Sequence, residues 1–163
     1  MTKTIKVLIV EDNQHDSELI RRQINKGSQD YEFVTVDNII EYQKSLENFN
    51  PDIIISDFTL PQFSGMEALE IRNKLKYFLP FILVTGSINE EVAVECIKAG
   101  ADDYILKHNL SRLEHAVNSV LKKAEIIRSK ELAEKTLKET ENIFSAFMEH
   151  SPVYIFFKDE EIR

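Results

Sequence analysis

The sequence has little of several features that define other protein classes. It contains one cysteine, Cys96, so no disulfide can form within the chain, and this usage fits a reducing cytosol. It has no run of about 18 apolar residues, so we expect no membrane-spanning helix. Its first residues run straight into an apolar stretch and lack the layout of a signal peptide. These absences favour a cytoplasmic protein.

Positive charge and glycine are also scarce. Twenty lysines and arginines stand against 28 acidic residues, which gives a formal net charge of −8. Such a balance argues against a broad nucleic-acid surface, so we expect no nucleic-acid partner. The four glycines form neither a phosphate loop nor a G-x-G-x-x-G pattern, so nucleotide binding is not expected within these residues. A kinase catalytic core is therefore not predicted in this segment.

Short apolar runs alternate with helix-like segments as far as about residue 125. These runs are nearly continuous, as is typical of strands covered on both faces. The predicted strands are Ile5–Val10, Phe33–Val36, Asp52–Ser56, Phe81–Val84 and Tyr104–Leu106. Possible capping boxes mark helix starts between them, at Asn38/Glu41, Ser64/Glu67, Ser87/Glu90 and Ser111/Glu114. The alternation predicts an α/β fold with a doubly wound, five-stranded parallel sheet.

Chemically useful side chains follow four of these strands. Glu11 and Asp12 come after the first strand and Asp57 after the third, while Thr85 and Lys107 follow the fourth and fifth. In an open parallel sheet the functional crevice lies beyond the carboxyl ends of the strands. Carboxylates that converge there repel one another unless a cation compensates, and oxygen ligands suit Mg²⁺. A metal, an attacking carboxylate, a hydroxyl and an ammonium together predict phosphoryl transfer.

Each of these residues also has a simpler structural interpretation. An acidic pair after a strand is often a solvated loop, and a single Asp is often a helix cap. Thr85 could cap a helix, and Lys107 could extend its ammonium into solvent. The functional interpretation gains its weight from all five residues occupying one edge of the predicted sheet.

Residues 4–124 resemble the receiver domain of response regulators, which has a flavodoxin-like fold. The resemblance is carried by four motifs: Val7–Asn13, residues 51–61 with Ser64-Gly65, Leu83–Gly86 and Gly100–Lys107. It implies a phosphorelay in which Asp57 accepts a phosphoryl group from a phosphohistidine on a histidine kinase or a phosphotransfer protein. It also implies that Asp12 and the backbone carbonyl of Thr59 are Mg²⁺ ligands beside Asp57, and that Glu11 assists the metal through water. Thr85 and Lys107 would bind phosphoryl oxygens, and Tyr104 would act as a rotamer switch. Thr59 and Ser87 would affect the lifetime of the phosphoryl group.

One position departs from the family pattern. The family usually has a proline, joined by a cis peptide bond, after the lysine, and here the residue is His108. A cis bond before a residue other than proline costs about 3–4 kcal/mol. We therefore predict a trans Lys107–His108 bond, a rearranged loop and a solvated His108. The variant resembles receivers that precede sensory domains in multidomain kinases.

The predicted last helix continues far beyond a compact domain, to about Met148, without Gly or Pro. One apolar stripe along it is predicted to pack on the domain: Leu113, Val117, Val120, Ala124 and Ile127. A second is predicted to face a second copy in a coiled coil: Ile126, Ala133, Leu137, Thr140, Phe144 and Phe147. A single solvated helix is the alternative.

Residues 144–163, with the motifs Phe147–Pro152 and Ile155–Asp159, resemble the start of a PAS sensory domain. The expected organisation is therefore a receiver domain over 1–124, a helical coiled-coil linker over 125–148 and a truncated PAS domain from 149. This arrangement implies a longer parent protein, such as a hybrid histidine kinase.

Two other functions compete with this interpretation. Haloacid-dehalogenase-like phosphatases need a second Asp two residues after the nucleophile, and Thr59 occupies that position. A pseudo-receiver, acting only in dimerisation or interaction, would be expected to lack at least one of the five site residues, and all five are present. The cognate kinase, the sensed signal and the phosphoryl lifetime cannot be read from the sequence.

Overall fold

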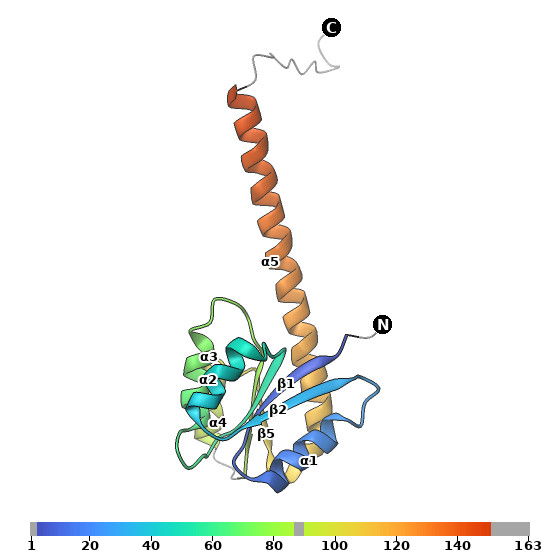
Figure 1. The fold of residues 1–163 in the computed structure, drawn as a ribbon, viewed down its shortest axis with the longest axis vertical. Helices are drawn as coiled ribbons and strands as arrows, with labels where there is room; N and C mark the ends of the chain where they lie inside the picture. The colour runs from blue at the N-terminus through green and yellow to red at the C-terminus, as the bar shows by residue number, and fades with distance from the viewer. Residues whose placement is uncertain (1–2, 87–89, 151–163) are drawn as a thin grey trace. The chain divides into compact units, whose positions relative to one another are not determined.

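The computed structural model describes residues 3–86 and 90–150 of the chain. It contains a five-stranded parallel sheet with the strand order β2-β1-β3-β4-β5 (Figure 1). The strands are β1 (Ile5–Val10), β2 (Tyr31–Val36), β3 (Ile53–Asp57), β4 (Phe81–Thr85) and β5 (Asp103–Leu106). The helices are α1 (Gln14–Ile24), α2 (Ile39–Asn48), α3 (Gly65–Asn73), α4 (Glu90–Lys98), the 3-10 helix η1 (Lys107–Arg112) and α5 (Leu113–His150). The predicted doubly wound sheet with an extended C-terminal helix is confirmed.

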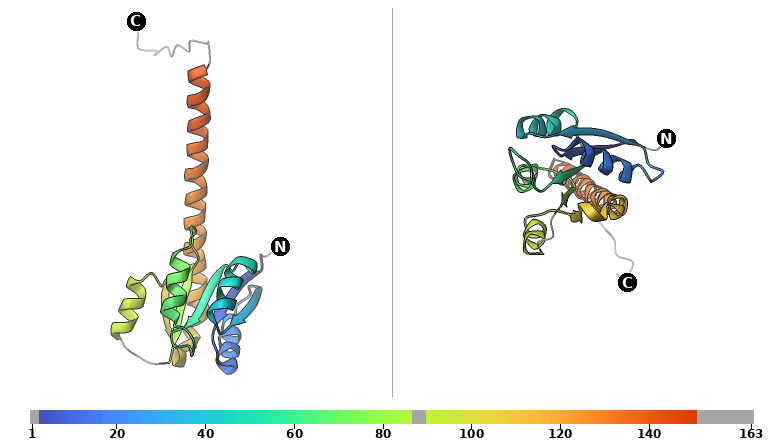
Figure 2. Two further views of the ribbon diagram at one scale, coloured as in Figure 1. Left: turned by 60° about the vertical axis from the view of Figure 1, so that its left-hand side comes forward. Right: turned by 90° about the horizontal axis from the view of Figure 1, so that it is seen from below.

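Alternation within the strands builds a separate core on each face of the sheet. In β1, Leu8 and Val10 point into one core, while Val7 and Ile9 point into the other. Successive side chains of a strand point to opposite faces, so a strand covered on both sides must be apolar at every position. The first core lies under α2, α3 and α4, and the second under α1 and the first turns of α5. Figure 2 shows from below how these two groups of helices flank the sheet.

The predicted strands differ from the observed ones at their ends. β2 begins at Tyr31, two residues before the predicted start, and β3 and β4 each extend one residue further, through Asp57 and Thr85. Both extensions follow the pairing register, in which Asp57 lies opposite Val84. Asp57 and Thr85 are thus the last residues of their strands and not the first residues of loops, which holds their backbones within the sheet.

Helix starts depend on side chains that accept hydrogen bonds from exposed backbone amides. Ser64 and Glu67 form the predicted reciprocal capping box at the start of α3. Asn38 accepts from the amide of Glu41, which makes it the predicted cap of α2. The predicted box at Ser111 is wrong, because the chain is already helical from Lys107 and the Ser111 hydroxyl donates to Asn109 instead. The box predicted at Ser87 lies outside the described residues.

The chain divides into two compact units, residues 1–126 and 127–163, and α5 contributes to both. In the first unit, Leu113, Val117, Val120 and Ala124 are buried, as predicted for the first apolar stripe. The last predicted member of that stripe, Ile127, falls in the second unit and is half-buried. In the second unit, every described side chain after Ile127 is exposed, including Leu137, which is 61% exposed. The boundaries predicted from the sequence, at 124 and 148, remain predictions.

Candidate functional site

The strand order brings residues that are distant in the sequence to one edge of the sheet. β1 and β3 are neighbours, and the chain leaves β1 toward β2 on one side but returns to β3 on the other. The carboxyl ends of β1 and β3 therefore open onto the switch point where such folds form their sites. Glu11, Asp12 and Asp57 meet here, with one oxygen of each within 4.8 Å of the others. The sequence predicted this convergence.

The Lys107 side chain extends from the residue directly after β5, past the end of β4, to these carboxylates. Its Nζ atom donates to Asp57 Oδ2 at 2.8 Å and to Glu11 Oε2 at 2.9 Å. A third acceptor, Asp16 Oδ2 on the first turn of α1, lies 2.6 Å away. Because an ammonium carries three hydrogens, all three donors of Lys107 are occupied by carboxylates.

Burial makes the charges of this cluster costly. The side chain of Glu11 is 1% exposed and that of Asp57 is 9% exposed. Burial raises the pKa of Glu11 and outweighs the hydrogen bonds from Lys107 and from the Asn13 amide, while the nearby Asp57 raises it further. Burial lowers the pKa of Lys107, but its hydrogen bonds to Asp16, Asp57 and Glu11 together hold that pKa above the usual value. The ammonium therefore stays charged.

The loop between β3 and α3 is held close to Asp57. The Thr59 amide donates to Asp57 Oδ1 at 3.3 Å, and Thr59 pairs with Ser64 across the loop in a short antiparallel bridge. The next residue, Gly65, donates its amide to the Phe58 carbonyl at 3.0 Å. A Cβ atom at Gly65 would lie 2.7 Å from Leu83 Cδ2 and too close to the Asp57 carbonyl oxygen. Only glycine lets α3 start this close to β3.

Thr85 and Tyr104 lie on the two strands beyond β3. Thr85 is buried at the end of β4, and the half-buried Tyr104 packs against the core under α2, α3 and α4. Their sheet positions agree with the prediction, while their proposed roles in a switch remain predictions. Ser87 lies outside the described residues.

The loop after Lys107 adopts the predicted trans geometry, since the described residues contain no cis peptide bond. The chain forms η1 directly after β5, and Leu110 from this helix is buried in the core beside α1 and α5. His108 is exposed, as predicted. The buried Leu110 side chain therefore anchors the loop to the core.

Asp16 is the contact that the sequence analysis missed. It lies three residues after the cap Asn13, in the first turn of α1, so the available signal was an acidic residue at the start of the helix that follows β1. Asn13 caps α1 and accepts from the amides of His15 and Asp16 at 2.9 and 3.3 Å. The cap starts the helix early enough to bring Asp16 to the site.

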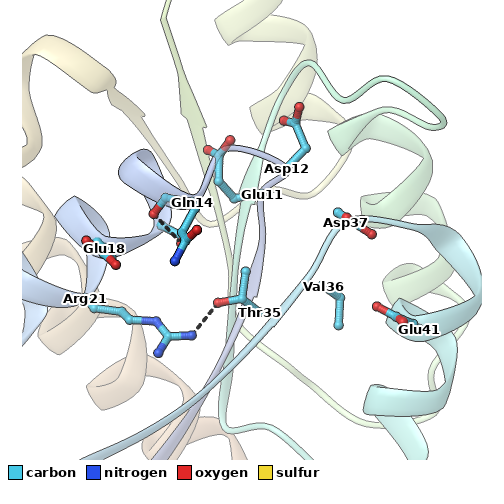
Figure 3. A pocket seen from close by; sticks show the side chains of 10 residues that line it. Glu11, Asp12, Gln14, Glu18, Arg21, Thr35, Val36, Asp37 and Glu41 are labelled. Carbon is cyan, nitrogen blue, oxygen red and sulfur yellow. Dashed lines mark hydrogen bonds between the residues drawn. The ribbon is translucent and has the colours of Figure 1, made fainter.

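A cavity of about 310 Å³ opens beside the cluster, between α1 and β2 (Figure 3). Glu11 and Asp12 form one side of it, and Arg21 donates to the Thr35 hydroxyl at 2.6 Å on the opposite side. Glu18 also lines this cavity from α1. The site is thus open to solvent on the side of Asp12, which is exposed, while Glu11 is buried.

The donor set fits a hard divalent cation. Glu11, Asp12 and Asp57 offer only oxygen atoms, and Asp12 is exposed, which leaves room for water ligands. Mg²⁺ prefers one or two carboxylates together with several waters. The cluster could therefore hold Mg²⁺.

Among the described residues, none of the helices has the length and apolar character needed to cross a membrane.

Comparisons with known proteins agree with this geometry. Residues 7–118 match the response regulator receiver domain family, and the chain belongs to this family. Receiver domains of two-component systems bind Mg²⁺ at an acidic site and interact with histidine kinases or phosphotransfer proteins. The acidic cluster at the switch point is thus the phosphoacceptor site of a receiver domain.

Individual relatives match most of the chain. The chemotaxis protein CheY of Thermotoga maritima is 30% identical over 119 residues, which cover 72% of this chain and 98% of CheY. An osmosensing histidine protein kinase of Saccharomyces cerevisiae is 28% identical over 111 residues, 64% of this chain but 9% of the kinase. The signal receiver domain of a Vibrio parahaemolyticus Luxo repressor protein, known from a crystal structure, has a TM-score of 0.71 and 28% identity, covering 79% of this chain and 98% of that domain. The chain spans half or less of the length of several other curated relatives.

Proposed function

We propose that Asp57 is the phosphoacceptor and that it takes a phosphoryl group from a phosphohistidine on a histidine kinase or a phosphotransfer protein. The observation that carries the proposal is the Lys107 ammonium, which contacts Asp57 and Glu11 from sequence positions 50 and 96 residues away. One Asp57 carboxylate oxygen attacks phosphorus, a P–O bond forms, the P–N bond breaks, and the imidazole leaves with its electron pair. Mg²⁺, when bound, would neutralise charge on the phosphoryl oxygens.

The other site residues take the roles that the receiver-domain resemblance implies. Asp12 and the Thr59 carbonyl would ligate Mg²⁺ together with Asp57, and Glu11 would hold a metal-bound water. Lys107 is positioned to bind a phosphoryl oxygen, because it already contacts the carboxylate that would carry the phosphoryl group. The Thr85 hydroxyl would bind a phosphoryl oxygen, and Tyr104 would act as the rotamer switch. Thr59 and Ser87 would affect the lifetime of the phosphoryl group.

Labelling with a small phosphodonor tests this assignment. Incubation with acetyl phosphate and Mg²⁺ should give an adduct that is stable in acid and labile in base, and Asp57→Asn should abolish it. Asp37→Asn is the matched control, because Asp37 is an exposed carboxylate that lines the neighbouring cavity. Labelling that persists in Asp57→Asn would contradict the assignment. A wild-type protein that is never labelled would support the pseudo-receiver alternative.

We further propose that the signal leaves through α5 toward a sensory domain, and that α5 pairs with the same helix of a second copy of the chain. The exposed stripe on residues 127–150 supports this, since Leu137 and Phe144 are each 61% exposed and Phe147 is 58% exposed. An apolar stripe at alternating spacings of three and four residues is typical of a coiled-coil seam. The coiled-coil linker over 125–148, the PAS start from 149 and the hybrid-kinase parent belong to the same proposal, as does a cytoplasmic location.

Light scattering tests the dimer. The wild-type chain should have the mass of a dimer, and the double substitution Leu137→Glu with Phe144→Glu should give a monomer. Ser145→Glu adds charge at a neighbouring exposed position outside the stripe and should remain dimeric. A monomeric wild-type chain would rule out this interface.

A further inference from the structure

Asp16 contacts the Lys107 ammonium but does not belong to the carboxylate group that could hold a metal. Its Oδ2 atom makes the shortest of the three Lys107 contacts, at 2.6 Å. The three carboxylates that converge within 4.8 Å are Glu11, Asp12 and Asp57. Asp16 therefore gives the ammonium an acceptor outside that group.

Lys107 and a divalent cation depend on the same two carboxylates. Two of the three hydrogen bonds of Lys107 go to Glu11 and Asp57, and both residues lie in the group suited to a cation. A cation that binds there must weaken both hydrogen bonds, because it attracts the same two carboxylates and repels the ammonium. The bond to Asp16 is the one that the cation leaves intact.

We propose that Asp16 is a positioning residue that retains Lys107 beside the site while a divalent cation takes over Glu11 and Asp57. The proposal rests on the proposed function, because it assumes that Mg²⁺ occupies the cluster. Without Asp16, the ammonium would depend entirely on Glu11 and Asp57 and would compete more strongly with the cation. Asp16 therefore favours metal binding although it is not a metal ligand.

The backbone around Asp16 suits this role. Asp16 lies in the first turn of α1, where a negative charge interacts favourably with the helix dipole. Its amide donates to the capping side chain of Asn13 at 3.3 Å, so the helix start holds its Cα in place. The carboxylate is 27% exposed, so it stays solvated when the other acceptors of Lys107 are withdrawn.

Mg²⁺ titration of the full chain by isothermal calorimetry, after removal of metal with EDTA, tests the proposal. Asp16→Asn should raise the Mg²⁺ dissociation constant by roughly threefold to tenfold, the range expected for losing a typical intramolecular hydrogen bond. Glu18→Gln is the matched control, because Glu18 is an exposed carboxylate on the same helix and lines the same cavity. It removes an equal charge without a Lys107 contact and should have a smaller effect. Asp16→Ala, which also removes the acceptor, should weaken binding at least as much as Asp16→Asn.

A Lys107→Met background separates the contact from a general charge effect. Lys107→Met alone should tighten Mg²⁺ binding, and in that background Asp16→Asn should weaken binding no more than Glu18→Gln does. Equal effects of Asp16→Asn and Glu18→Gln in the wild-type background would overturn the role of Asp16, while leaving the metal site itself established. A wild-type chain that binds no Mg²⁺ would overturn both this role and the metal assignment of the proposed function.

Discussion

Replacement of Lys107 with methionine should destabilise the protein when no divalent cation is present and should matter much less when Mg²⁺ is bound. Lys107 is the cation that compensates Glu11, Asp57 and Asp16. Methionine keeps much of the apolar stem and removes the ammonium, which leaves two buried carboxylates facing each other without a positive partner. A bound cation would restore that partner.

The structure sets the size of this effect. Removal of one partner from a buried ion pair costs about 3–5 kcal/mol. The Lys107 side chain is 22% exposed and that of Asp16 is 27% exposed, so water already screens part of the interaction. We therefore expect a loss of about 2–3 kcal/mol in the free energy of unfolding, below the fully buried range. For a chain of this size that loss lowers the Tm by roughly 5–10 °C.

The loss should also depend on pH, with a sign set by Glu11. Burial raises the pKa of Glu11, and the Lys107 hydrogen bond opposes that rise, so the pKa of Glu11 should rise further in Lys107→Met. A carboxyl group whose pKa rises on folding stabilises the fold in its protonated form, and that contribution is lost as the pH rises through the folded-state pKa. The deficit of the variant should therefore be smaller at about pH 5 than at about pH 8.

Urea unfolding followed by circular dichroism measures the effect, with and without Mg²⁺ at constant ionic strength. Lys123→Met is the matched control: Lys123 also pairs with a carboxylate, at 2.9 Å from Asp102, but is 57% exposed and lies away from the cluster. Mg²⁺ should recover at least half of the Lys107→Met deficit and none of the Lys123→Met deficit. If Mg²⁺ stabilised the wild type but left the Lys107→Met deficit unchanged, Lys107 would not be compensating the carboxylates.

Two further predictions concern the packing that supports the site. Gly65→Ala should lower the free energy of unfolding by about 1–3 kcal/mol, because its Cβ would lie 2.7 Å from Leu83 Cδ2. Gly86→Ala is the control, because nothing lies within 4 Å of a Cβ atom there. Equal urea midpoints for the two variants would refute the steric explanation. Asp102→Ala should lower the free energy of unfolding by about 3–5 kcal/mol, because it removes the carboxylate partner of Arg72, which is 8% exposed. Adding Arg72→Met to that variant should lower the free energy of unfolding little further. Additive losses in urea unfolding would show that the two residues are not coupled.

The sequence predicted the sheet well because strands covered on both faces must be apolar at nearly every position. This pattern located β1 and the middle of β3 and β4. It missed the start of β2, where the polar Glu32 interrupts the apolar run and Tyr31 stands alone before it. It also ended β3 at Ser56, because hydropathy carries no information on backbone pairing, and pairing with β4 is what includes Asp57 in the strand.

The candidate site was predictable to the extent that its residues lie directly at strand ends. Glu11, Asp12 and Asp57 follow from strand order alone, and the structure brings them together. Asp16 was missed because its contribution depends on the geometry of a helix start, which the cap at Asn13 sets. The start predicted at Ser111 was wrong for a related reason, since a capping pattern cannot show that the chain has already turned into η1 at Lys107.

The hydrogen bond between Lys107 and Glu11 joins residues 96 positions apart, and both must be in place before the cluster exists. Contacts of such long sequence separation form late in folding, because the entropy of closing the intervening loops must first be offset. A chain that lacks β5 during synthesis has the carboxylates of β1 and β3 but no ammonium between them. The cluster is therefore a marker of completed folding, and the chemistry that depends on it becomes available only after the last strand has joined the sheet.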